Sequence, residues 1–222
     1  NIKTYMQGAK QAGFGGVKAP TEDRDNFPPD LHQTFWCTEK SIEFIEKNRG
    51  EDQPWLLSIN PFDPHAPFDP PWEYYQRYDV ETLPGAHFEA RDLEHQQHLL
   101  DTEVDFQSQP QPPEDWDHKR MQAAYYAMIE QIDHEFGRLL DYLEETGQRE
   151  NTIVIFMSDH GEMLGDHGLI LKGCRFYEGL TRVPLMISWP GHFSADVVSD
   201  ALVELMDLVP TFYDVLEMEM PY

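Results

Sequence analysis

Basic residues and cysteines are scarce in this sequence. Only 16 Lys and Arg stand against 41 Asp and Glu, so the formal net charge is −25. This shortage excludes a general binder of nucleic acid or of an anionic membrane surface, because both need a basic face. Cys37 and Cys174 are the two cysteines. Two are too few for a disulfide framework, and they leave the redox compartment open.

Long hydrophobic runs are also missing. The longest apolar stretches, such as residues 152–157, are far shorter than the roughly 18 residues that a membrane-spanning helix needs. No signal peptide is recognisable at the start, where the chain begins at Asn1 without a methionine. We therefore expect no membrane span, and we expect the sequence to be a piece of a longer protein.

What the sequence does contain is typical of a folded protein. It has 222 residues, of which 40% are hydrophobic and 13% aromatic, whereas disordered acidic chains are poor in aromatic residues. The length suffices for one large α/β domain or two small ones with a sizeable core. The excess of acidic residues therefore belongs on a folded surface.

Hydrophobic periodicity predicts alternating strands and helices. Apolar residues three and four apart predict a long amphipathic helix from residue 117 to 146, ended by Gly147. Asp207 is the expected N-cap of a last helix. Further predictions are a short helix at 36–47 and buried strands at 54–59, 152–157 and 182–189. The alternation gives an α/β class, and the short apolar strands favour a parallel sheet.

Two segments are predicted to lack regular structure. Residues 60–71 contain five prolines, which exclude a helix and make a rigid loop around His65. Residues 72–116 show little periodicity and read as a long irregular insertion.

Residues with chemical potential follow the predicted strands. His65 follows the first strand, Asp159 and His160 follow the second, and Lys172 lies a little further on. In open α/β sheets the ligand binds outside the carboxyl ends of the strands. An adjacent carboxylate and imidazole make half of a divalent metal site, since Ca²⁺, Mg²⁺ and Zn²⁺ all need further ligands. The residues alone leave open a turn cap at Asp159 and an ordinary loop histidine at His160.

Several motifs together resemble the type I sulfatase family of the alkaline phosphatase-like superfamily. In order and spacing they are similar to the later portion of its catalytic domain. The motifs are Leu-His-Gln-Thr-Phe-Trp-Cys at 31–37, Asp-Pro-His-Ala-Pro at 63–67, Ser-Asp-His-Gly-Glu at 158–162, Gly-Asp-His-Gly at 165–168, Lys-Gly at 172–173, Arg-Val-Pro-Leu at 182–185, Trp-Pro-Gly at 189–191 and Asp-Leu-Val-Pro-Thr at 207–211. The resemblance implies a three-layer α/β/α sheet that is incomplete at both ends, with residues 1–222 forming part of one catalytic domain.

The resemblance also implies roles for individual residues. Asp159 and His160 match two metal ligands, usually to Ca²⁺, and Lys172 matches a lysine that binds the sulfate oxygens. His65 matches the histidine that contacts the sulfate and protonates the leaving alkoxide. His167 lies in a segment that lines the family's site, where it is a candidate substrate contact beside the alternative of simple turn chemistry.

Two parts of the family pattern are not found in the sequence. Sulfatases attack with the hydrate of a formylglycine made from a Cys or Ser in a Cys-x-Pro-x-Arg type of motif, and neither Cys37 nor Cys174 stands in one. The family's small C-terminal subdomain is not found either. We expect the nucleophile, two further metal-binding aspartates and this subdomain to lie outside the 222 residues.

The expected function is hydrolysis of sulfate esters on an anionic, sulfated carbohydrate. One alternative is a phosphonate monoester or phosphodiester hydrolase of the same superfamily. Another is a non-catalytic sulfatase-like binding module, against which the joint presence of His65, Asp159, His160 and Lys172 argues. The family resemblance favours a periplasmic or secreted protein, while the oligomeric state is open.

The acidic surface is compatible with an anionic substrate because the charge is unevenly distributed. Residues 89–117 hold nine acidic residues and one Arg, whereas residues 158–182 hold four acidic and three basic residues. The field at a site is set by nearby charges and by a bound metal. A nearly balanced segment in an acidic chain is therefore the expected location of the site.

From the missing nucleophile we predict that the isolated 222 residues do not hydrolyse an aryl sulfate. Release of the phenol, followed by absorbance, measures this directly. Turnover above the rate of a denatured sample would contradict the prediction.

Overall fold

The computed structural model describes residues 28–50, 53–101, 110–173 and 175–221. No helix in this part of the chain is long and apolar enough to cross a membrane. The helices are α2 (Gln33–Asn48), α3 (Trp72–Tyr75), α4 (Ala90–Asp101), α5 (His118–Glu145), α6 (Glu178–Thr181) and α7 (Leu208–Val215), the strands are β1 (Val154–Met157) and β2 (Leu185–Ser188), and short 3-10 helices lie at Pro29–Leu31, Val80–Thr82, Pro113–Trp116, Arg149–Asn151, Asp166–Gly168 and Leu205–Asp207.

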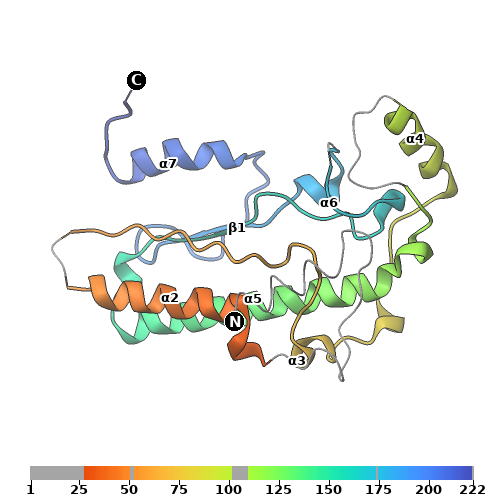
Figure 1. Ribbon diagram of the computed structural model, residues 1–222. Helices are drawn as coiled ribbons and strands as arrows, with labels where there is room; N and C mark the ends of the chain where they lie inside the picture. The colour runs from red at the N-terminus through yellow and green to blue at the C-terminus, as the bar shows by residue number, and fades with distance from the viewer. Residues whose placement is uncertain (1–27, 51–52, 102–109, 174, 222) are drawn as a thin grey trace.

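The elements form layers, which confirms the predicted α/β class. Helices α2 and α5 pack side by side below the two strands, and α7 lies on the other side of the strands (Figure 1). The extended segment at 53–61 runs along the same middle layer. This is an α/β/α order.

The sheet differs from the expected one. Strands β1 and β2 occupy two of the predicted positions, but they pair antiparallel, with Ile155 opposite Ile187. The prediction of a strand at 54–59 is wrong, because this segment is extended without a ladder and Leu56 is 90% exposed. A strand of a parallel sheet is buried on both faces, which the exposed Leu56 is not. In the described residues the sheet has two strands.

The long helix α5 is present as predicted. Its C-terminal end closes in a Schellman motif, in which the Gln148 N–H donates to Leu143 O at 2.8 Å and the Gly147 N–H donates to Glu144 O at 3.0 Å. Gly147 has φ +70°, a conformation that favours glycine. The sequence signal for the end of this helix was therefore correct.

The main core lies on the N-terminal half of α5. Its floor consists of Ala123, Ala124 and Ala127, all with no exposed surface. Against it pack Phe68 from the segment before α3 and Leu164 from the segment after β1. A second cluster joins α2 to the other half of α5 through Ile45, Leu139 and Leu143.

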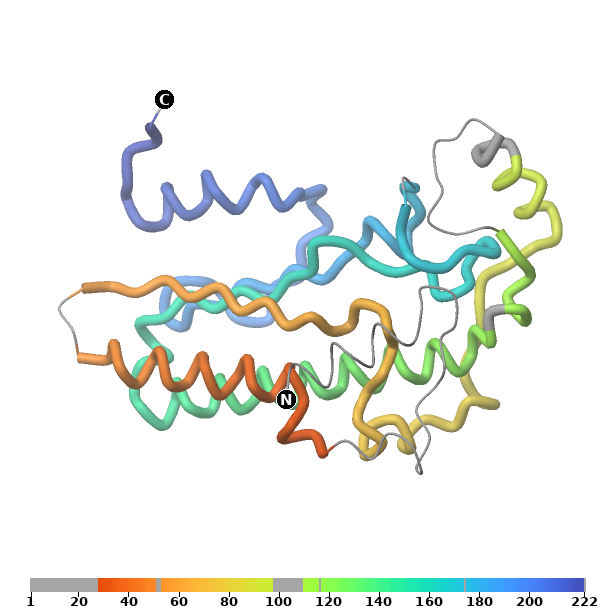
Figure 2. Tube along the Cα trace, viewed as in Figure 1, coloured from red at the N-terminus to blue at the C-terminus, as the bar shows by residue number. Residues whose placement is uncertain are grey.

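The segment at 72–116 is more regular than predicted. It contains α3, the 3-10 helices at Val80–Thr82 and Pro113–Trp116, and the twelve-residue α4. Figure 2 shows α4 beside the turn at 166–168, with which it is in contact. The sequence of α4 is mostly polar and did not predict a helix, because this helix is stabilised by the residues it packs against.

Helix α7 begins where the sequence predicted. Asp207 occupies its N-cap position but does not cap it with its side chain. Its carboxylate instead accepts a hydrogen bond from the Glu204 N–H at 2.8 Å, in a capping box of the preceding 3-10 turn.

Gly161 allows the chain after β1 to approach the segment that forms α6. Its N–H donates to Leu180 O at 2.8 Å, and a Cβ at this position would lie 1.8 Å from Gly179 O. We predict that Gly161→Ala lowers the free energy of unfolding by about 1 to 3 kcal/mol, because backbone must move to relieve the overlap.

Gly137 provides the matched control. It lies within α5, and a Cβ there would meet nothing within 4 Å. Gly137→Ala should raise the free energy of unfolding by about 1 kcal/mol through helix propensity. Urea unfolding followed by circular dichroism measures both changes, and equal stability of the Gly161→Ala variant and the wild type would refute the steric argument.

Candidate functional site

The segment after β1, residues 158–173, folds back on itself, and we call it the Asp-His loop. The Met163 N–H donates to Leu171 O at 3.0 Å, and the Gly165 N–H donates to Leu169 O at 2.7 Å. These bonds close the loop like a hairpin. They bring Lys172 back to the place where the loop begins.

Lys172 has a buried ammonium group that faces Glu162. Its Nζ lies 3.8 Å from Glu162 Oε2 and makes no hydrogen bond to the described residues. Glu162 is 8% exposed. Burial raises the pKa of its carboxyl, and the positive charge of Lys172 partly offsets this rise. The N–H donors of Lys172 thus have no hydrogen-bond acceptor in the described part of the chain, and an anion's oxygens are acceptors of the right kind.

Asp159 and His160 present one oxygen and one nitrogen ligand together. His160 Nδ1 lies 2.8 Å from Gly161 O, a carbonyl that can only accept, so Nδ1 is the donor and Nε2 is the ring nitrogen left for a metal ion. His160 Nε2 is 3.8 Å from Asp159 Oδ2. A metal-binding histidine usually donates its other N–H in this way. The two side chains fit part of a divalent cation site.

The set of metal ligands is incomplete in the described ranges. They contain no group of three or more His, Cys, Asp or Glu side chains that could hold a metal ion. Ca²⁺ takes six to eight oxygens and Zn²⁺ about four ligands. A cation bound by Asp159 and His160 would therefore need further ligands.

His65 lies in residues 60–71, which we call the histidine loop. Its Nδ1 is 2.6 Å from Ala66 O, and its backbone N–H donates to Phe62 O at 3.1 Å. The ring packs on that of Phe62, with 4.9 Å between centroids. The imidazole is held on one side, which leaves Nε2 for a substrate.

The two loops meet over α5. Ala66 and Phe68 of the histidine loop share the main core with Leu171 of the Asp-His loop. The Tyr125 ring lies 5.9 Å from that of Phe68. Burial raises the pKa of Tyr125 to about 12, and the negative charges of Glu162 and Asp159 add to the rise. Tyr125 thus stands between the loops that carry the predicted catalytic and metal-binding residues.

His167 is held away from this meeting point, against α4. Its Nδ1 is 3.4 Å from Asp92 Oδ2, and its ring stacks on Tyr177 at 4.1 Å. Burial alone would raise the pKa of Asp92, but the Glu89 N–H and His167 together lower it. The contacts described for His167 tie α4 to the Asp-His loop, and its role as a substrate contact stays a prediction.

A second contact ties α4 to the residues after the Asp-His loop. The Arg175 Nε–H donates to Gln96 Oε1 at 3.1 Å, and Gln96 Nε2 donates to Tyr177 Oη at 2.8 Å. Gln96 has no exposed surface. Helix α4 is therefore fixed next to the site by buried polar groups.

Sequence reasoning missed the polar residues beneath the histidine loop. The Asp63 side chain is fully buried, and its Oδ2 accepts a hydrogen bond from Thr34 Oγ1 at 3.0 Å. Burial raises the pKa of Asp63 to about 7 and lowers the pKa of His32 to about 4. Their side chains are 3.6 Å apart, and burial favours the uncharged form of each. The motif at 63–67 was the signal that could have pointed to Asp63.

Comparison with known proteins gives one family. The family model described as Sulfatase matches residues 8–218. An arylsulfatase of Clostridium perfringens is 36% identical over 202 residues, which cover 88% of this chain and 40% of that protein. An N-acetylglucosamine-6-O-sulfatase of Bacteroides thetaiotaomicron is 39% identical over 107 residues, which cover 48% of this chain and 19% of that protein.

A solved structure of similar fold is a phosphonate monoester hydrolase from Silicibacter pomeroyi. It matches with a TM-score of 0.79 and 25% identity, over 100% of this chain and 48% of that one. The chain thus spans less than half the length of the relatives it matches. The likeness confirms the alkaline phosphatase-like fold.

We predict that His32 and Asp63 oppose each other in the pH dependence of stability. Between about pH 4 and 7 folded Asp63 holds a proton that the unfolded chain has released, so its contribution falls as pH rises. Between about pH 4 and 6.5 folded His32 lacks a proton that the unfolded chain binds, so its contribution rises with pH. The other titratable neighbour is Cys37, whose pKa is raised by burial and then by Asp63.

Replacing His32 should leave the pH dependence of stability that Asp63 alone contributes. In His32→Gln, stability should fall from pH 4 to pH 7 more steeply than in the wild type, and His32→Gln with Asp63→Asn should lose that extra fall. Urea unfolding at several pH values provides the measurement. An identical pH slope in the wild type and His32→Gln would contradict the assignment.

Proposed function

The chain belongs to the sulfatase family, and we propose that the protein hydrolyses sulfate esters at the meeting point of the histidine loop and the Asp-His loop. One observation carries this proposal. The Lys172 ammonium is buried, makes no hydrogen bond to the described residues and faces Glu162. A buried cation with unused donors suits a tetrahedral oxyanion.

In the proposed reaction Lys172 binds the sulfate oxygens. Charge on these oxygens and on the leaving oxygen changes as the S–O bond breaks, and a fixed ammonium group stabilises that charge without reorganisation. Asp159 and His160 would hold a divalent cation, for which we propose Ca²⁺. When bound, the cation would supply further positive charge to the sulfate.

His65 is the proposed acid that protonates the leaving alkoxide. Its Nδ1 is occupied by Ala66 O, so the proton would come from Nε2. An imidazole suits this role because it exchanges protons near neutral pH. The contact with Ala66 fixes the ring so that only one nitrogen faces the substrate.

The attacking group is proposed to be the hydrate of a formylglycine outside the 222 residues. Neither cysteine of the chain stands in the Cys-x-Pro-x-Arg motif from which this group is made. The residues described here would bind the sulfate, hold the cation and protonate the leaving group.

A sulfated carbohydrate is the proposed substrate, with His167 as a candidate contact. The similarity to an N-acetylglucosamine-6-O-sulfatase over about half of the chain supports it. The second candidate function is hydrolysis of phosphonate monoesters, which the structural likeness to a phosphonate monoester hydrolase favours. Both reactions need the same cationic pocket, since the transferred groups are tetrahedral and anionic.

Substitution of the two proposed catalytic residues tests the assignment. In the full-length protein, His65→Ala and Lys172→Ala should each lower kcat/KM by about 10² to 10³ on the preferred ester, because each removes a group that acts on developing charge. Assays with aryl sulfates, sulfated glucosamine and aryl phosphonates decide between the two functions.

Matched controls are His95→Ala and Lys40→Ala. His95 is exposed on α4, and Lys40 is an exposed residue on α2 that pairs with Glu43. Both variants should keep the wild-type rate. Unchanged activity in His65→Ala and Lys172→Ala would refute the site.

A separate experiment tests the assignment of Asp159 and His160 as metal ligands. A chelator should lower the activity of the wild type, and Ca²⁺ should restore it. Asp159→Asn should need more Ca²⁺ for the same recovery, because one ionised ligand is lost. Activity that survives extensive chelation would refute the metal role of Asp159 and His160.

A further inference from the structure

We propose that the N-terminal end of α2 positions His65 through a polar latch, made by Thr34 and Gln33 on α2 and by Phe62 and Asp63 on the histidine loop, of which the Thr34–Asp63 pair is buried. The inference rests on the proposed function, in that His65 is taken as the acid. It assigns a positioning role to Thr34 and Gln33, which contact residues of the histidine loop 29 positions further along the sequence.

The latch has two direct hydrogen bonds. Thr34 Oγ1 donates to Asp63 Oδ2 at 3.0 Å, and the Phe62 N–H donates to Gln33 Oε1 at 3.0 Å. His32 supports them from below, because its Nδ1 accepts the Thr34 N–H at 3.4 Å and lies 3.6 Å from Asp63 Oδ2. The N-cap residue His32 and the first two residues of α2, Gln33 and Thr34, thus contact two successive residues of the loop.

Burial makes the bond from Thr34 hard to replace. The Asp63 side chain is fully buried, and His32 and Thr34 are each 2% exposed. Asp63 Oδ1 finds no hydrogen-bond donor in the described part of the chain. If the Thr34 hydroxyl is removed, water cannot take its place without a local opening, and the buried carboxyl loses a main donor.

The latch is connected to the imidazole through Phe62. The His65 N–H donates to Phe62 O at 3.1 Å, and the two rings are in contact. His65 Nδ1 is also held by Ala66 O. A shift of Phe62 and Asp63 would therefore move the ring, rather than being absorbed by a slack segment.

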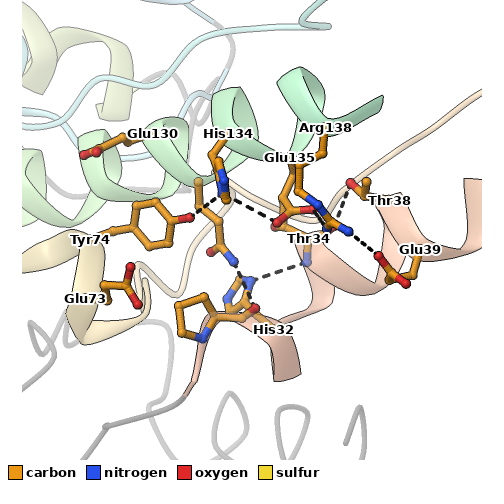
Figure 3. A network of polar contacts seen from close by, with 12 residues as sticks. His32, Thr34, Thr38, Glu39, Glu73, Tyr74, Glu130, His134, Glu135 and Arg138 are labelled. Atoms are coloured by element: carbon orange, nitrogen blue, oxygen red, sulfur yellow. Dashed lines mark hydrogen bonds and ion pairs between the residues drawn. The ribbon is translucent and has the colours of Figure 1, made fainter. Parts of the chain in front are cut away.

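The α2 side of the latch is itself fixed to α5. Figure 3 shows Arg138 of α5 reaching Glu39 of α2 and its neighbour Glu135. Gln131 Nε2 donates to Pro29 O at 3.3 Å. Beyond the other end of the histidine loop, Tyr74 Oη lies 2.9 Å from His134 Nδ1 (Figure 3). The loop is thus held on both sides by groups that rest on one helix.

The test compares Thr34→Val, which keeps the shape and removes the hydroxyl, with Thr34→Ser, which keeps the hydroxyl. Thr38→Val is the matched control, since Thr38 is buried one turn later on α2 and its hydroxyl faces Thr34 O at 3.5 Å. In the full-length protein, Thr34→Val should lower kcat about tenfold and leave KM within about twofold, because a small misplacement of a reacting group costs rate more than binding.

Thr34→Ser should regain most of the rate, and Thr38→Val should match the wild type. A merely structural role of Thr34 would lower the amount of folded enzyme, which thermal unfolding detects, without this separation of kcat from KM. Equal kcat in Thr34→Val and the wild type would overturn the latch, and so would an equal loss in Thr38→Val.

Hydrogen exchange gives a second readout that does not depend on activity. The peptide covering residues 60–70 should exchange faster in Thr34→Val than in Thr34→Ser or Thr38→Val, because the loop opens more often. If the wild type hydrolyses neither sulfate nor phosphonate esters, the proposed function fails, and exchange alone decides whether the latch holds the loop. Unchanged exchange in Thr34→Val would overturn it.

Discussion

Close packing on the alanine floor of α5 is the constraint on which the site depends. Ala123, Ala124 and Ala127 are wholly buried, and each ends at its Cβ. The histidine loop can therefore bring Phe68 down to the helix, and the Asp-His loop can do the same with Leu164. Burying one such side chain contributes about 1.5 to 3 kcal/mol. The same contacts that stabilise the core set the distance between the two loops.

The burial of the three alanines of the floor could not be predicted from the sequence pattern. The periodic large residues of α5, such as Met121 and Met128, predicted the helix and its buried face, and both are fully buried. Alanine favours a helix wherever it stands, so it carries little sign of burial. The most tightly packed part of the core was therefore invisible in the pattern. By contrast Gly147 predicted the end of α5, because only local backbone geometry is involved there.

Errors occurred where a segment depends on distant partners. The apolar run at 54–59 has the composition of a buried strand, but pairing is decided by neighbouring strands, not by composition. The polar α4 gave no periodic signal, since Gln96 and Asp92 meet partners some 75 to 80 residues away. In the candidate site, the motifs predicted roles for His65, Asp159, His160 and Lys172, and these roles stay predictions. The pairs Lys172–Glu162 and Thr34–Asp63 could not be predicted, because such pairs form only once the chain has folded.

The ties between α4 and the Asp-His loop also limit how relatives can be recombined. Asp92 contacts His167, and Gln96 contacts both Arg175 and Tyr177. A chimera that carried another relative's α4 would replace the α4 side of all three contacts at once. Helix α4 should therefore be exchanged together with His167, Arg175 and Tyr177. A chimera keeps these contacts only if α4 and the three residues come from the same relative.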